Sequence, residues 1–242
     1  MEYTTLGKTG LRVSRMGFGG IPIQKVDAAV TRKLMERLVE RGVNYIDTAR
    51  GYTVSESFLG EALEGGLREK FVLATKSMAR TRAEMERDIE ISLRNLRTDH
   101  IDLYQVHNPS LAELEQVTAP SGALEALLAA KAAGKIGHIG VTAHMASVFE
   151  KALTMDWVET VMFPYNIVET QGEALMQKCR EQNVGFICMK PMAGGALEDA
   201  RLAMRFIGRN ENVSVVIPGM YDVREIDQNI EAIEDASQLT EA

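Results

Sequence analysis

Residues 71–106, FVLATKSMARTRAEMERDIEISLRNLRTDHIDLYQV, contain the unit that decides the fold. Two strand-sized apolar runs, Phe71 to Ala74 and Ile101 to Val106, enclose a segment with helical periodicity, Arg82 to Leu96. The runs are nearly continuous in apolar residues instead of alternating, which is typical of parallel strands buried on both faces by their crossover helices. The stretch therefore predicts a strand, helix and parallel strand of an α/β protein.

The same alternation of runs and helical segments extends over the whole chain. Further apolar runs occupy residues 16–18, 43–46, 136–141, 158–163, 184–189 and 213–217, and further helical segments occupy 28–41, 123–133, 148–155, 173–182, 200–209 and 222–233. About eight strand–helix units, without a G-x-G-x-x-G turn, favour a closed (β/α)8 TIM barrel over an open doubly wound sheet. Because 242 residues are the usual size of one such barrel, we expect a single domain over residues 1–242.

The first residues predict a smaller element. Tyr3 to Val13 contains a Gly-Lys-Thr-Gly turn between two short β-like runs, which indicates a β-hairpin that caps the bottom of the barrel.

Composition excludes several classes of function. Lys and Arg number 27 against 34 Asp and Glu, and a formal net charge of -7 disfavours nucleic-acid binding. The N-terminus lacks an apolar signal, and no stretch approaches the roughly 18 apolar residues of a membrane span, so we expect no membrane association and a cytoplasmic location. Cys179 and Cys188 have neither C-x-x-C spacing nor a histidine cluster, which predicts a reducing compartment and no metal site.

Polar side chains follow three successive apolar runs. Asp47, Lys76 and His107 each come at or just after the end of a predicted strand, and Tyr52 follows in the loop after Asp47. Taken singly, these residues would be a helix cap, a structural ion pair, a core histidine and a packing tyrosine. Active sites of TIM barrels form at the carboxyl ends of the strands, however, so the four together predict a site at the mouth of the barrel that these strand ends form.

The motifs around these residues resemble those of the aldo-keto reductases. The resemblance covers nearly the whole chain, is closest to the subgroup with a ferredoxin-like tail, and rests on NYIDTARGY (44–52), ATK (74–76), DLYQVHNP (102–109), GVTAH (140–144), PYNIV (164–168), MKPMAGG (189–195) and VIPG (216–219). It implies reduction of an aldehyde or ketone by hydride from NAD(P)H. In that family an Asp, a Tyr, a Lys and a His act together, and Asp47, Tyr52, Lys76 and His107 match those positions.

The chemistry of this quartet follows from carbonyl reduction. Hydride addition leaves negative charge on oxygen, so a proton donor must lie within hydrogen-bonding distance, and Tyr52 is the candidate. Because an unperturbed tyrosine has a pKa of about 10, we expect the ammonium of Lys76 to lower the pKa of Tyr52. Asp47 would pair with Lys76, and His107 would orient the carbonyl or assist proton transfer.

The resemblance also implies a cofactor site for NADP(H) or NAD(H). The residues expected to bind it are Gly19, Gly20, Asp47, Thr142, Met189, Lys190, Pro191, Met192, Gly194, Pro218, Gly219, Met220, Arg224, Glu225 and Asn229. Met78, Met189, Met192 and Met220 all lie near strand ends, where they could line the pocket or simply fill the core. Arg224 followed by Glu225 makes an incomplete clamp for a 2′-phosphate, so we expect weak discrimination between NADPH and NADH.

Two other functions suit some of these features. A barrel aldolase could form a Schiff base on Lys76, and a non-catalytic barrel could bind nucleotide as a sensor. The resemblance further implies a C-terminal loop walling the substrate cleft and, in the tailed subgroup, cysteine-ligated iron–sulfur sites. Because the sequence stops at Ala242 without either, we expect low affinity and broad tolerance among small carbonyl compounds.

Overall fold

The structure, a computed structural model, describes residues 1–235. Its main sheet is parallel and its strands follow one another in chain order. They are β3 (Phe18–Gly19), β4 (Tyr45–Asp47), β5 (Val72–Ser77), β6 (Ile101–Val106), β7 (Ile136–Thr142), β8 (Thr160–Pro164), β9 (Gly185–Met189) and β10 (Val215–Val216). Each overlaps a predicted apolar run.

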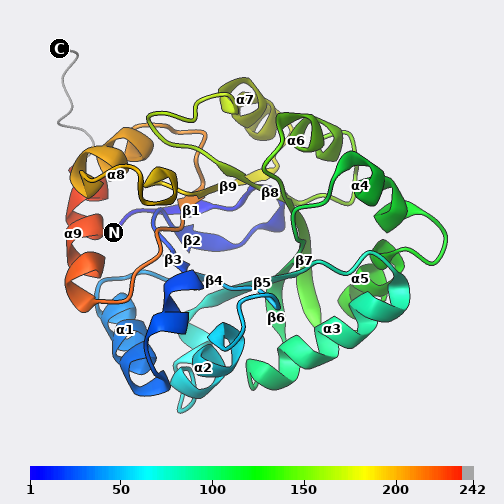
Figure 1. Cartoon of the computed structure of the whole chain (residues 1–242), viewed down its shortest axis with the longest axis horizontal. Coiled ribbons are helices and arrows are strands. Elements are labelled where there is room, and N and C mark those ends of the chain that lie inside the picture. The colour runs from blue at the N-terminus through cyan, green and yellow to red at the C-terminus, as the bar shows by residue number, and fades with distance from the viewer. Residues whose placement is uncertain (236–242) are drawn as a thin grey trace.

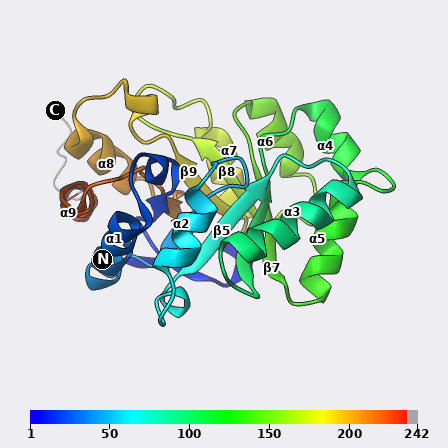
Figure 2. The same cartoon turned by 60° about the horizontal axis from the view of Figure 1, so that its bottom comes forward.

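The two edges of this sheet meet. Isolated parallel bridges join Met16 to Val216 and Gly19 to Gly219, and the Gly17 amide donates to the Val216 carbonyl at 2.8 Å. The sheet therefore curls round into the predicted (β/α)8 barrel, with the helices in a ring outside it (Figure 1). Turning the molecule shows the helices running alongside the strands that they connect (Figure 2).

The helices confirm the predicted segments and add two more. They are α1 (Ala28–Glu40), α2 (Ser55–Ala62), α3 (Arg82–Asn95), α4 (Leu111–Thr118), α5 (Ala123–Ala132), α6 (Ala146–Ala152), α7 (Glu173–Glu181), α8 (Ala200–Gly208) and α9 (Val223–Glu234). The sequence did not predict α2 or α4, which are eight residues each. Helices this short are marginal by themselves, so packing on the barrel stabilises them.

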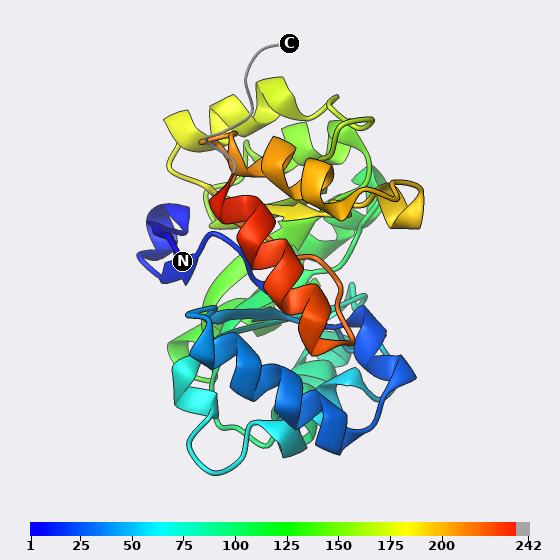
Figure 3. The ribbon, with the colours of Figure 1, turned by 90° about the vertical axis from the view of Figure 1, so that its left-hand side faces the viewer.

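The predicted hairpin is present and closes one end of the barrel. β1 (Tyr3–Thr5) pairs antiparallel with β2 (Arg12–Ser14), and Leu6 and Val13 are fully buried among inward-facing side chains of the strands. In Figure 3 the hairpin, in dark blue, lies on one side of the molecule, near the N-terminus. The amino group of Met1 forms an ion pair with Glu234 of α9 at 2.6 Å, which holds the start of the chain against the last described helix.

The inward-facing side chains change character along the strands. Tyr45, Ala74 and Leu103, on β4, β5 and β6, belong to the apolar cluster inside the barrel. Successive side chains of a strand point to opposite faces, so the next inward positions toward the carboxyl ends are Asp47, Lys76 and Gln105. The barrel therefore places a polar layer directly above its apolar interior, at the end opposite the hairpin.

Three further observations concern the other sequence-based expectations. Cys179 and Cys188 are buried free thiols. Among residues 1–235, no helix combines the length and the apolar character that crossing a membrane requires. The same residues contain no cluster of three or more His, Cys, Asp and Glu side chains arranged to hold a metal ion. The end of the chain, on which the expectation of an open substrate cleft rests, lies outside the described residues.

Candidate active site

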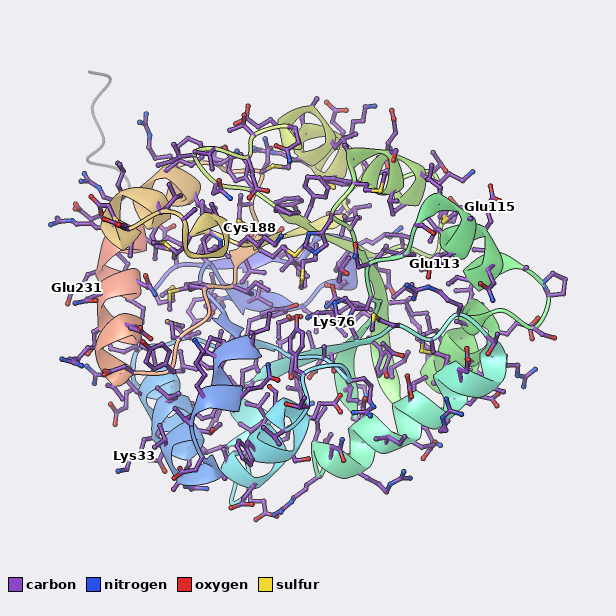
Figure 4. The ribbon with its side chains drawn as sticks, viewed as in Figure 1. Lys33, Lys76, Glu113, Glu115, Cys188 and Glu231 are labelled. Carbon is purple, nitrogen blue, oxygen red and sulfur yellow. The ribbon has the colours of Figure 1, made fainter. Side chains whose placement is uncertain are left out.

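A buried ion pair lies at the base of the mouth. The Lys76 ammonium donates to the Asp47 carboxylate and, at 2.8 Å, to the carbonyl of Thr48. Gln105 donates its amide to the other carboxylate oxygen at 3.0 Å. Asp47 and Lys76 are each only 2% exposed, and Figure 4 shows Lys76 near the centre of the ring of helices. A charge pair this deep persists because each charge is both paired and hydrogen bonded.

Tyr52 and His107 complete the group. The Lys76 ammonium lies 5.0 Å from the centre of the Tyr52 ring, and the Tyr52 and His107 rings meet edge to face at 6.0 Å between centres. Tyr52, His107, Asp47 and Lys76 line one cavity of about 520 Å³. The fold thus brings together the four side chains that the sequence singled out.

The electrostatics of Tyr52 differ from the sequence-based expectation. Burial raises the pKa of the Tyr52 hydroxyl above its ordinary value, and the Lys76 charge, which acts in the predicted direction, only partly offsets this. Burial likewise raises the pKa of Asp47, against the opposing effects of Lys76 and Gln105. At neutral pH the Tyr52 hydroxyl therefore keeps its proton and can donate it.

His107 is held as the neutral imidazole. Burial, together with the charges of Lys76 and Arg80, lowers the pKa of His107 to about 3. Arg80 also donates to the His107 carbonyl at 2.9 Å, which fixes the backbone at this strand end. The His107 Nδ1 atom is buried and has no hydrogen-bond partner among the described residues.

This environment predicts how stability depends on pH. Because the pKa of His107 is lower in the folded protein than the value of about 6.5 in an unfolded chain, protonation favours unfolding. The free energy of unfolding should have its full value above pH 6.5 and decrease as the pH falls from 6.5 toward 3. Urea unfolding at pH 7.0, 6.0 and 5.0 measures this, in a range above the titration of most carboxylates.

The control for this prediction uses two histidine variants. His107→Asn should flatten the decrease between pH 6.5 and 5, and His144→Gln should flatten part of it. His144 contributes in the same direction as His107, because burial and Lys190 lower the pKa of His144. Equal slopes in wild type and His107→Asn would contradict the assignment.

Most of the predicted cofactor residues lie on the same cavity. Besides Asp47, these are Gly19, Gly20, Thr142, Met189, Lys190, Pro191, Met192, Gly194 and Gly219. The turn after β9 has left-handed backbone at Lys190 and Ala193, with φ of 55° and 49°, followed by Gly194 and Gly195 at 71° and 99°. A Cβ atom added to either glycine would meet no atom within 4 Å, so the turn faces open space.

Five predicted cofactor residues do not line the cavity. Two of them, Met220 and Pro218, instead contribute packing and a hydrogen bond to the barrel. Met220 is fully buried in the core between strands and helices, and the Pro218 carbonyl accepts the Gly19 amide at 2.9 Å. Asn229 is buried on α9. The methionines thus divide between roles: Met189 and Met192 line the cavity, Met220 fills the core and Met78 is 64% exposed.

The last two, Arg224 and Glu225, are engaged at the start of α9. The Arg224 guanidinium pairs with Asp222 at 2.8 Å although its side chain is 85% exposed. Glu225 accepts the backbone amides of Tyr221 and Asp222, completing a capping box. Neither charge points to the cavity as a free group in the described structure.

Several residues of the cavity were not predicted. They are Ile21, Pro22, His144, Met162, Gly195, Leu197 and Ile217. Ile21 and Pro22 directly follow the predicted pair Gly19 and Gly20, and His144 ends the motif that supplied Thr142. Their position next to or within these motifs could therefore have predicted that they line the cavity. Met162 on β8 and Ile217 just after β10 belong to the inward-facing cluster, which only the three-dimensional barrel reveals.

Comparison with known proteins gives consistent results. The Aldo/keto reductase family model matches residues 15–201. Aldo-keto reductase YhdN of Bacillus subtilis is 29% identical over 224 residues, which cover 82% of this chain and 66% of that protein. L-galactose dehydrogenase of Arabidopsis thaliana is 26% identical over 293 residues, with 99% and 90% covered. This chain thus spans about two thirds of the Bacillus relative and most of the plant one.

Solved structures agree with the sequence comparisons. The holo form of aldo-keto reductase AKR11C1 from Bacillus halodurans superposes with a TM-score of 0.85 at 26% identity, covering 97% of this chain and 91% of that one. Its apo form gives a TM-score of 0.81 over 97% and 90%. Since the family model matches well over half of the chain and the solved structure covers 97% of it, this protein belongs to the aldo/keto reductase family of NAD(P)H-dependent oxidoreductases.

Proposed function

We propose that this protein reduces an aldehyde or ketone to the alcohol, with NAD(P)H as hydride donor and Tyr52 as proton donor. The observation that carries the proposal is the buried pair of Asp47 and Lys76 beneath the Tyr52 ring, inside the cavity at the strand ends. Family membership supplies the class of reaction. The site supplies a protonated phenol with a cation next to it.

The cavity fits a nicotinamide dinucleotide. The turn after β9 presents open glycine backbone at Gly194 and Gly195, which lets a phosphate approach closely. Lys190, exposed in the same turn, adds a positive charge. Apolar side chains such as Ile217 and Met189 could cover a flat aromatic ring deeper in the cavity. When bound, the nicotinamide supplies the hydride, which no side chain provides.

The chain's own residues then handle the proton. The O–H bond of Tyr52 breaks as a new O–H bond forms on the former carbonyl oxygen, and the phenolate is left next to Lys76. An alkoxide is far more basic than a phenolate, so this transfer is favourable even though burial raises the pKa of Tyr52. Neutral His107 can donate one hydrogen bond to the carbonyl oxygen without competing for the proton. Asp47 keeps Lys76 in place.

The geometry does not favour an aldolase. A Schiff base requires a neutral lysine amine with room to attack a carbonyl carbon. Lys76 is instead ion paired with Asp47 and donates a hydrogen bond to the Thr48 carbonyl. Borohydride treatment with an aldehyde should therefore leave Lys76 unmodified. A trapped adduct would support the aldolase instead.

The test of the proposed function is nucleotide binding followed by turnover. Binding of NADPH and NADH is best followed by nicotinamide fluorescence, because Trp157 precedes β8 and lies at the amino ends of the strands. We expect saturable binding and then nucleotide oxidation when small aldehydes and ketones are added. Binding without oxidation on any carbonyl compound would favour a nucleotide sensor.

We also propose that the two nucleotides are weakly discriminated. Because Arg224 is paired with Asp222 and Glu225 caps α9, neither is arranged to select for or against a 2′-phosphate. The ratio of kcat/KM for NADPH over NADH should lie below about 10³, equivalent to about 4 kcal/mol. Asp222→Asn retains a good helix cap but frees Arg224, and should raise the ratio. A wild-type ratio above that limit would contradict the proposal.

The setting proposed for the enzyme follows from the same features. We propose a small-molecule carbonyl substrate, with no role for nucleic acid and no metal, in the cytoplasm. The net charge of -7 and the two free buried thiols support this setting.

A further inference from the structure

A second buried carboxylate lies behind the site, on the outer side of the barrel wall. Glu56, in the first turn of α2, is 1% exposed and accepts four hydrogen bonds. One oxygen accepts from Thr75 of β5 at 2.8 Å and from Ser92 of α3 at 2.7 Å. The other accepts from Asn95 of α3 at 3.1 Å and from Arg50 at 3.2 Å. None of the site chemistry described above uses this cluster.

The cluster clamps the turn that carries Tyr52. Arg50 precedes Tyr52 by two residues, and its backbone amide donates to the carbonyl of Lys76 at 2.9 Å. The Tyr52 amide donates to the Ala49 carbonyl at 3.0 Å, and the Tyr52 carbonyl accepts from Ser55 at 2.7 Å. Arg50 on one side and α2 on the other are both attached to Glu56, so the turn between them is fixed at both ends.

The same clamp includes the strand of the site lysine. Thr75 and Lys76 are neighbours on β5 and point to opposite faces, Thr75 outward to Glu56 and Lys76 inward to Asp47. Glu56 is therefore hydrogen bonded to the strand that carries Lys76 and, through Arg50, to the turn that carries Tyr52. A buried carboxylate lowers the stability of the folded protein unless it is well paired, and packing alone does not require one.

We propose that Glu56 is a positioning residue for proton transfer, which holds the Tyr52 hydroxyl in place over Lys76 by joining the 50–52 turn to β5. This inference rests on the proposed role of Tyr52. It extends that role to a residue that does not line the cavity and whose hydrogen bonds go to Arg50, Thr75, Ser92 and Asn95.

The experiment compares Glu56→Gln with a matched variant, Glu159→Gln. Glu159 is also a shielded carboxylate with several donors, Lys131 at 2.6 Å, His138 at 2.7 Å and the Ile139 amide at 2.9 Å, but it precedes β8 at the amino ends of the strands. Glu56→Gln should lower kcat about 10- to 100-fold, because a reacting group that is displaced reacts more slowly. The Kd of the nucleotide should stay within about twofold of the wild-type value. Glu159→Gln should lose thermal stability while kcat stays within about twofold.

A second readout separates positioning from a general loss of structure. In the Tyr52→Phe background no phenol remains to be positioned, so adding Glu56→Gln should change kcat less than about twofold. The solvent deuterium isotope effect on kcat should rise in Glu56→Gln alone. Arg50→Met, which leaves Glu56 three other donors, should reproduce both results if Glu56→Gln does not fold.

Two outcomes would overturn the inference. Equal losses of kcat on the wild-type and Tyr52→Phe backgrounds would show that Glu56 acts through the fold in general. Wild-type kcat in both Glu56→Gln and Arg50→Met would show that the turn holds its position without the clamp. If Tyr52→Phe itself retained full activity, the proposed function of Tyr52 would fail instead, and the comparison of backgrounds would reveal which of the two is wrong.

Discussion

Tyr52→Phe is expected to lower kcat by about 100-fold or more, while the Kd of the nicotinamide nucleotide stays within about twofold. The substitution removes one hydroxyl and leaves the ring in place between Lys76 and His107. A 100-fold decrease corresponds to a loss of about 3 kcal/mol of transition-state stabilisation. Steady-state kinetics on a responsive aldehyde, together with a fluorescence titration of the nucleotide, measure the two quantities separately.

Tyr3→Phe provides the matched control. Tyr3 also uses its hydroxyl in a hydrogen bond, to the Gly42 carbonyl at 2.6 Å, but it lies in the hairpin at the other end of the barrel. Its loss should leave kcat within about twofold. Near-normal turnover in Tyr52→Phe would remove Tyr52 from the role of proton donor.

Lys76→Met is expected to abolish measurable reduction and to destabilise the protein. The variant leaves Asp47 buried without its cation, and breaking a buried pair in this way typically costs about 3–5 kcal/mol of unfolding free energy. Without Lys76, burial should raise the pKa of Asp47 further. A carboxyl group whose pKa is raised in the folded state favours folding at low pH and loses this as the pH rises. The defect should therefore be smaller at pH 5 than at pH 8.

The double variant Asp47→Asn with Lys76→Met distinguishes stability from chemistry. Removing both charges should recover much of the lost stability, because no unpaired charge then remains buried. Activity should stay absent, since the cation near Tyr52 is still missing. Urea unfolding and aldehyde turnover measure the two effects. Recovery of activity in the double variant would mean that Lys76 does not act on Tyr52.

The sequence predicted the convergence of the site because parallel strands in register place their carboxyl ends at one mouth. Asp47, Lys76 and His107 come from three successive strands, so their proximity followed from the barrel itself. The resemblance to the aldo-keto reductases, and not the strand pattern, placed Gly194 and Lys190 at the cofactor site, and both line the cavity. Short helices such as α2 were missed because their stability comes from tertiary packing and not from local pattern.

What the sequence could not predict depends on three-dimensional surroundings. Burial outweighs the Lys76 charge at Tyr52, and the extent of burial is set by everything that encloses the ring. Arg224 forms its hydrogen bond with Asp222, only two residues away. Comparing motifs does not reveal that a neighbouring carboxylate competes with a bound phosphate for this arginine. Met220 is buried in the core although its neighbour Gly219 lines the cavity, a division that the motif does not reveal.

The ion pair between Met1 and Glu234 has a consequence for protein engineering. It brings the start of the chain against the end of α9, so in a variant that ends at Asp235 a short linker could join the two ends while the backbone is opened elsewhere. Gly134, exposed in the turn between α5 and β7 at the amino ends of the strands, is a suitable new terminus, because no cavity residue lies near it in the chain. In a circular permutant of this kind β7 would be the first strand made on the ribosome, and the order of synthesis could be varied while the mouth of the barrel stays intact.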